Sequence, residues 1–116
     1  MNRVLILIFV IFAAYSEIKF DGNVGLDEWA SADKHTIDYE IAPSYNTAAE
    51  HLTEAFITHD DKYIYVAFKA YGNKEYIRAN IRSRDGIAWQ NDHVVVGIDT
   101  FGDGRYYSGF GVNPLG

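Results

Sequence analysis

The stretch DDKYIYVAFKA, residues 60–70, decides the fold class because it joins a polar turn to a regular alternation of side chains. Residues 60–62 are short and charged, which is typical of a turn. Every second residue after the turn falls on one apolar face, made of Ile64, Val66, Phe68 and Ala70. A period of two is that of a β-strand with one buried face. The stretch therefore predicts a half-buried strand over residues 63–70.

Shorter segments of the same kind lie on both sides of this strand. We expect further strands at residues 18–20, 36–41, 53–59, 77–82, 93–100 and 106–112. Turns or loops separate them at Asp21-Gly22, at 43–49 and at 101–105, where Gly-Asp-Gly suits a hairpin. No segment keeps a period of 3.6. The pattern predicts an all-β fold, an antiparallel sandwich or barrel, and we expect a β-sandwich of immunoglobulin-like or jelly-roll-like type.

The first residues of the chain predict export, and the last residues predict a β-sandwich with further strands beyond residue 116. Residues 1–3 carry one positive charge, residues 4–14 are apolar, and Ala14-Tyr15-Ser16 is a small–x–small cleavage site. This pattern is typical of a secretory signal peptide at 1–16, followed by one domain at 17–116, in the periplasm or at the cell surface. The apolar run is shorter than the roughly 20 residues of a membrane-spanning helix, and a buried strand or helix is the alternative. Residues 113–116 read as a turn leading onward, so we expect the sandwich to be incomplete at its C-terminus.

Composition excludes several classes of function. The net charge is −6 and the pI about 5.0, whereas a nucleic-acid-binding protein needs a basic face. The chain has no cysteine, which rules out disulfides and thiolate metal sites. It also lacks a nucleophile elbow, a phosphate loop and paired zinc-binding histidines. We therefore expect a binding module and no enzyme. A pair of carboxylates that could act in glycoside hydrolysis remains possible, since pairs among sixteen acidic residues arise by chance.

Few residues of the sequence are candidates for binding calcium or haem. Asp21, Asp27 and Glu28 offer oxygen ligands that suit calcium, and turn formation is the alternative role. Asp99 and Asp103 resemble the start of a calcium loop, but their spacing favours a plain hairpin turn. A haem site with a methionine ligand is excluded, because Met1 leaves with the signal peptide.

Three stretches, taken in order, resemble carbohydrate-binding module family 9. They are residues 18–29, from IKFDG to DEW; residues 60–68, DDKYIYVAF; and residues 89–100, WQNDHVVVGIDT. The closing GFGVNPLG, residues 109–116, is similar to the variant at the front of large bacterial surface proteins, ahead of a predicted outer-membrane barrel region. The resemblance implies a non-catalytic β-sandwich with structural calcium that holds a sugar between aromatic rings. Any glycoside hydrolysis would belong to a separate domain.

The resemblance places the sugar site at one tryptophan. Trp89 corresponds to the residue that stacks on the sugar in the family, with an anchoring role in the core as the alternative. Neighbours in sequence that can bind sugar hydroxyls are Arg82, Arg84, Asp85, Gln90 and Asn91. Val95 stands where sugar-binding members carry a glutamate, three residues after the position of Asp92. We therefore expect an oligo- or polysaccharide ligand, as in carbohydrate catabolism; the alternative is an interaction domain of an outer-membrane-associated protein that has lost the sugar.

Overall fold

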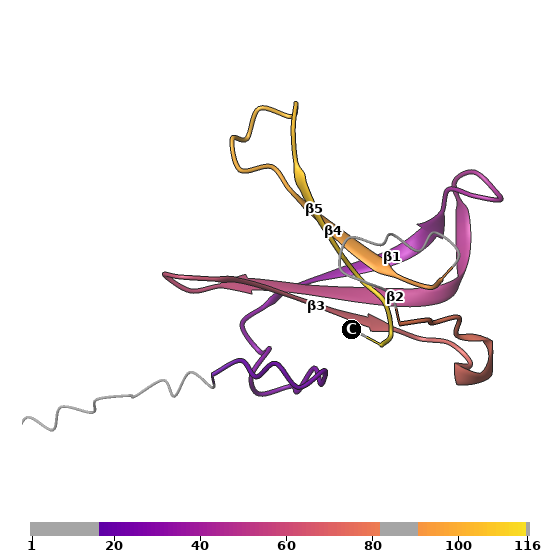
Figure 1. The fold of residues 1–116 in the computed structure, drawn as a ribbon, viewed down its shortest axis with the longest axis horizontal. Helices are drawn as coiled ribbons and strands as arrows, with labels where there is room; N and C mark the ends of the chain where they lie inside the picture. Colours follow the sequence, from indigo (N-terminus) through magenta and orange to yellow (C-terminus); the bar gives the residue numbers. More distant parts are fainter. Residues whose placement is uncertain (1–16, 82–90, 116) are drawn as a thin grey trace, which may run out of the picture.

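The computed structural model describes residues 17–81 and 91–115, and these form an almost wholly β structure (Figure 1). The elements in chain order are β1 (Asp33–Glu40), β2 (Thr47–His59), β3 (Ile64–Ala70), η1 (Lys74–Tyr76), β4 (Val94–Ile98) and β5 (Ser108–Val112). Within these two ranges, no helix has the length and apolar character needed to cross a membrane.

Strands β1, β2 and β3 form an antiparallel sheet in that order. Ala55, near the middle of β2, lies opposite His35 of β1 and Phe68 of β3. The register of β1 against β2 shifts between Ile37 and Tyr39. The sheet is thus a meander whose strands are joined by the loop at residues 41–46 and the turn at 60–63.

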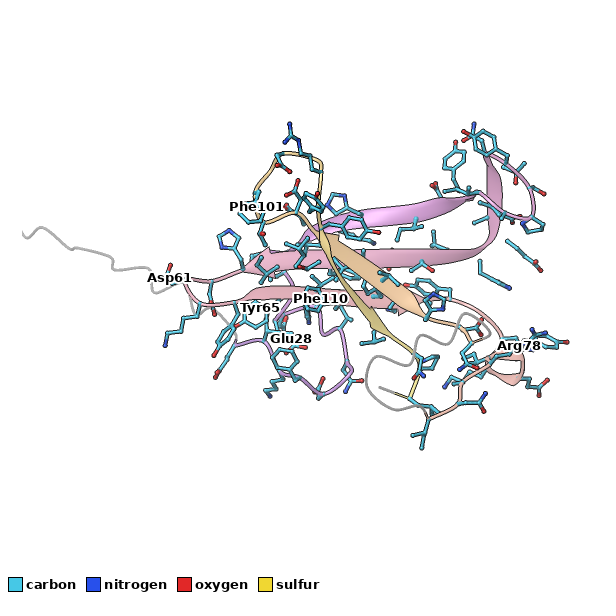
Figure 2. All side chains as sticks on the ribbon, turned by 45° about the horizontal axis from the view of Figure 1, so that its top comes forward. Glu28, Asp61, Tyr65, Arg78, Phe101 and Phe110 are labelled. Carbon is cyan, nitrogen blue, oxygen red and sulfur yellow. The ribbon has the colours of Figure 1, made fainter. Side chains whose placement is uncertain are left out.

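Strands β4 and β5 form a separate antiparallel hairpin. Val96 lies opposite Phe110, and Gly97 lies opposite Gly109. The hairpin crosses the three-stranded sheet at an angle (Figures 1 and 2). As predicted, Val94, Val96 and Ile98 are the less exposed residues of β4.

Two layers lie against the three-stranded sheet and give it a sandwich-like arrangement. The N-terminal segment, residues 17–32, covers the face that carries Phe56 and Tyr65. The other face bears Val66 and Phe68. An apolar pocket of about 490 Å³ is lined jointly by β3, by the inward residues of β4 and by the N-terminal segment. The all-β antiparallel fold predicted from the sequence is confirmed.

Two hydrophobic side chains are buried among the described residues, and both belong to the sheet and its N-terminal cover. Trp29 is 8% exposed and Ala55 is 6% exposed. The Trp29 ring meets the Phe56 ring nearly edge-on, with centroids 6.3 Å apart and planes at 64°. Edge-to-face contact is a favourable arrangement of aromatic rings. Trp29 is therefore the anchor that holds the N-terminal segment on the sheet.

Two predicted strands are absent from the described residues. Residues 18–20 belong to no strand, and the Lys19 N–H donates to the Glu28 carboxylate (3.2 Å) instead of to a neighbouring strand. Residues 77–81 also belong to no strand; the backbone of Arg78 bonds to Asp92, and no ladder forms. Alternation therefore predicted strands here that the structure does not contain. The loop predicted at 43–49 is shorter than expected, since β2 already begins at Thr47.

Candidate functional site

A group of hydrogen bonds joins residues that precede Trp89 in the sequence to residues that follow it. We call it the polar brace; it consists of Arg78, Asn80, Asn91, Asp92 and Asn113. The Arg78 N–H donates to the Asp92 carboxylate at 2.9 Å, and the Asp92 N–H donates to the Arg78 carbonyl at 2.8 Å. This reciprocal pair fixes Arg78 against Asp92.

Three asparagines extend the brace toward β5. The Asn80 amide donates to the Asn91 side-chain oxygen, and the Asn113 amide donates to the Asn80 carbonyl, both at 3.1 Å. The carbonyl of Asn91 also lies 2.8 Å from His93 Nδ1. The bond between Asn80 and Asn91 thus joins described residues that precede and follow positions 82–90 in the sequence.

Asn91 is the buried member of the brace, with 6% of its surface exposed. Its side-chain oxygen accepts from Asn80, whereas its Nδ2 has no acceptor in the part of the chain that the structure describes. A buried amide with half of its bonding capacity unused is rare, because an unmet donor costs free energy. Asn91 was one of the residues predicted to contact sugar, and it follows the others in the sequence.

The remaining predicted contact residues lie outside the described residues. They are Arg82, Arg84, Asp85, Trp89 and Gln90. Their role in sugar binding stays a prediction. Arg78, which precedes these residues in the sequence, lies at the opposite end of the sheet from Asp61 in the β2–β3 turn (Figure 2).

The predicted calcium ligands all lie in the N-terminal segment. The Asp21 carboxylate accepts the Asn23 N–H at 2.8 Å, which lowers the pKa of Asp21. The Glu28 carboxylate accepts from Lys19 (3.2 Å) and Gly25 (3.3 Å). The structure thus shows turn-forming bonds for Asp21 and Glu28, and within the described ranges no three acidic or histidine side chains group as metal ligands. Calcium at Asp21, Asp27 and Glu28 stays a prediction from sequence.

A second candidate site lies between the N-terminal segment and the sheet, and sequence reasoning missed it. This turn–sheet pocket has a volume of about 430 Å³. Its apolar wall includes Trp29 and Phe56, and its charged wall is formed by Lys34, Glu54, Lys69 and Tyr71. The charged residues come from three strands, and Tyr71 follows β3, so only the strand register brings these side chains together.

Glu54 is the centre of the charged wall. It forms an ion pair with Lys34, and the Tyr71 hydroxyl donates to it at 2.9 Å. The ion pair, and then the tyrosine, lower the pKa of Glu54, and the same carboxylate raises the pKa of Lys34. Lys69 lies opposite Glu54 in the register, with its ammonium 5.4 Å from the centre of the Tyr71 ring. The pocket therefore holds two ammonium groups and one carboxylate.

Comparison with family models, with curated proteins and with solved structures finds no match to this chain.

Proposed function

We propose that the protein is a non-catalytic carbohydrate-binding module whose sugar site includes Trp89 and is supported by the polar brace. The observation that carries this proposal is the brace itself, in which Asn80 and Asn91, one before and one after Trp89 in the sequence, bond at 3.1 Å. A sugar site needs its contact residues held in place before the ligand arrives, because ordering a loose loop reduces affinity. The brace, with the buried side chain of Asn91, supplies that support on both sides of Trp89 in the sequence.

The resemblance to family 9 modules adds the chemistry of the ligand. A flat ring such as that of Trp89 offers contact area to the apolar face of a pyranose. Arginine and amide side chains near Trp89 in the sequence can donate to sugar hydroxyls. We further propose that the module is exported and appended to a glycan-processing or surface protein, with structural calcium as its cofactor.

Substitution of Val95 tests this proposal through an expected gain of sugar affinity, beside the loss expected for Trp89→Ala. It lies on the outward face of β4, 52% exposed, so a longer polar side chain has room there. Val95→Glu restores the charged acceptor that the resemblance places at this position. A hydrogen bond from a sugar hydroxyl to a charged group contributes about 1.5–3 kcal/mol, so affinity is expected to rise roughly tenfold or more.

The experiment is calorimetric titration of the purified protein with a panel of mono- and oligosaccharides, in the presence of calcium. Trp89→Ala is expected to abolish binding, Val95→Glu to strengthen it, and Phe101→Ala, at the far end of the β4–β5 hairpin, to leave it unchanged. Binding that survives Trp89→Ala would contradict the proposed site.

An interaction domain that has lost the sugar is the second candidate, and the β4–β5 hairpin favours it. The hairpin carries large aromatic side chains that are mostly exposed: Phe101, Tyr106, Tyr107 and Phe110. Exposed aromatic groups of this kind are enriched in protein interfaces. If no sugar in the panel binds to the parent protein or to the Val95→Glu variant, this candidate replaces the first.

A further inference from the structure

The turn–sheet pocket has a charge opposite to that of the protein as a whole. The chain carries a net charge of −6, yet the pocket is lined by Lys34, Lys69 and a single carboxylate, that of Glu54. Glu54 is already shared between Lys34 and the Tyr71 hydroxyl. Lys69 has a ring contact with Tyr71 and, within the described residues, no ion pair. One positive charge is thus left over in the pocket.

The opposite wall of the pocket is apolar. It is formed by Val24, Leu26, Trp29, Ala30, Ala32 and Phe56. Its volume of about 430 Å³ falls in the range of small-molecule sites, which combine an apolar lining with a few convergent polar groups. Shape and lining suit a ligand whose body is a single apolar ring.

Trp29 gives the apolar wall a fixed aromatic surface. It is 8% exposed, and its ring packs nearly edge-on against Phe56 with centroids 6.3 Å apart. An aromatic surface that is already held in place can receive an apolar ring without the cost of ordering it.

We propose that the turn–sheet pocket binds a small organic carboxylate whose body is an apolar ring. The carboxylate of the ligand lies against the ammonium group of Lys69. The ring of the ligand lies against Trp29 and Phe56. Charge-assisted hydrogen bonds of this kind are stronger than neutral ones. This site is separate from the sugar site and does not depend on it.

The probe is cyclohexanecarboxylate, and the matched neutral control is cyclohexanecarboxamide. Both are titrated into the Trp89→Phe protein, in which Trp29 is the remaining tryptophan, so emission reports the pocket. We expect a saturable change in emission with the carboxylate, at least roughly tenfold weaker binding of the carboxamide, and weaker carboxylate binding as sodium chloride is added.

Two substitutions separate a charged site from a general effect on folding. Lys69→Met keeps the length of the side chain and is expected to weaken carboxylate binding roughly tenfold, whereas Lys74→Met, outside the pocket, leaves it unchanged. Glu54→Gln retains an acceptor for Tyr71 and removes the competing anion, so carboxylate binding is expected to tighten, a gain that misfolding cannot produce.

Three results would overturn the proposal. They are equal binding of the carboxylate and the carboxamide, a Glu54→Gln protein that binds no more tightly than its parent, and the absence of any saturable change at millimolar carboxylate.

Discussion

Asp60 closes the β2–β3 turn and also changes the acidity of a neighbouring tyrosine. Its carboxylate accepts the Tyr65 hydroxyl at 2.6 Å and the N–H groups of Lys62 (2.7 Å) and Tyr63 (2.8 Å). These bonds lower the pKa of Asp60, and the bond from Tyr65 has the largest effect. The same hydrogen bond to Asp60 raises the pKa of Tyr65 to about 12. The sequence predicted the turn from its composition, but it could not show the bond to Tyr65, which depends on the rotamers of two side chains.

The raised pKa of Tyr65 predicts a loss of stability in alkali. Because the folded-state value lies above the ordinary 10.0, the contribution of this tyrosine is complete below pH 10 and is lost as the pH rises through about 12. Ultraviolet titration of tyrosinate should show one group that ionises at about pH 12, and Tyr65→Phe should remove it. If the titration of the variant matches that of the parent, the Asp60–Tyr65 bond is not present in solution.

Trp29 is the residue whose loss should destabilise the fold most. Trp29→Ala removes the buried ring that packs on Phe56 and is expected to lower the free energy of unfolding by about 3 kcal/mol. The matched control is Phe101→Ala, since Phe101 is 82% exposed at the hairpin end (Figure 2), and it should cost less than about 0.5 kcal/mol. Urea unfolding followed by circular dichroism measures both; equal effects would contradict an anchoring role for Trp29.

At the scale of elements, one aspartate organises the turn between β4 and β5. The Asp99 carboxylate accepts the N–H groups of Phe101, Gly102 and Gly104 at 2.8–3.0 Å, and these bonds, that from Gly104 first, lower its pKa. Both glycines have a positive φ, 66° at Gly102 and 69° at Gly104. The choice of a hairpin turn over a calcium loop agrees with this geometry, since the carboxylate is engaged by backbone donors.

The glycines of this hairpin predict a position-dependent cost. Gly104→Ala meets no atom within 4 Å, so its penalty is that of a side chain at positive φ, about 1 kcal/mol. Gly109→Ala, within β5, places its Cβ at an ordinary 3.6 Å from the Tyr107 ring and should be tolerated. Thermal unfolding midpoints would show the difference; a Gly104→Ala protein as stable as its parent would argue against the turn as described.

Elements with regular alternation and a clear turn were predictable from sequence, and those that depend on distant partners were not. Residues 64–70 form β3, where a clear turn signal is followed by regular alternation of side chains. Residues 77–81 alternate equally well, but their backbone is bonded through the brace to Asp92 and not to a strand. Alternation reports which side chains share a face, whereas pairing requires a neighbour that the local sequence does not specify.

At the scale of the whole molecule, the sequence predicted the sandwich-like architecture but only part of its sites. Asn91 was selected for its place beside Trp89, and the structure adds that it is buried within a brace reaching to Asn113. The turn–sheet pocket escaped notice because Lys34, Glu54 and Lys69 are far apart in sequence and meet only through the β1–β2–β3 register.

Acid should destabilise the molecule through several carboxylates at once. Asp21, Glu54, Asp60 and Asp99 all have a lowered pKa in the folded protein. Their contribution is complete above the ordinary values of 3.8 for aspartate and 4.5 for glutamate, and it is lost as the pH falls through the lower folded-state values. Circular dichroism from pH 7 downward should show unfolding that begins below about pH 4.5; a protein whose stability rises in that range would contradict these contacts.

The central claim is that the protein binds a sugar at a site that includes Trp89 and is supported by the polar brace. The most direct test follows tryptophan emission while the purified protein is titrated with mono- and oligosaccharides, once with calcium and once with a chelator. The account predicts a saturable change with one class of sugar, which is lost in Trp89→Ala and retained in Phe101→Ala. A folded protein whose emission no sugar changes would contradict it.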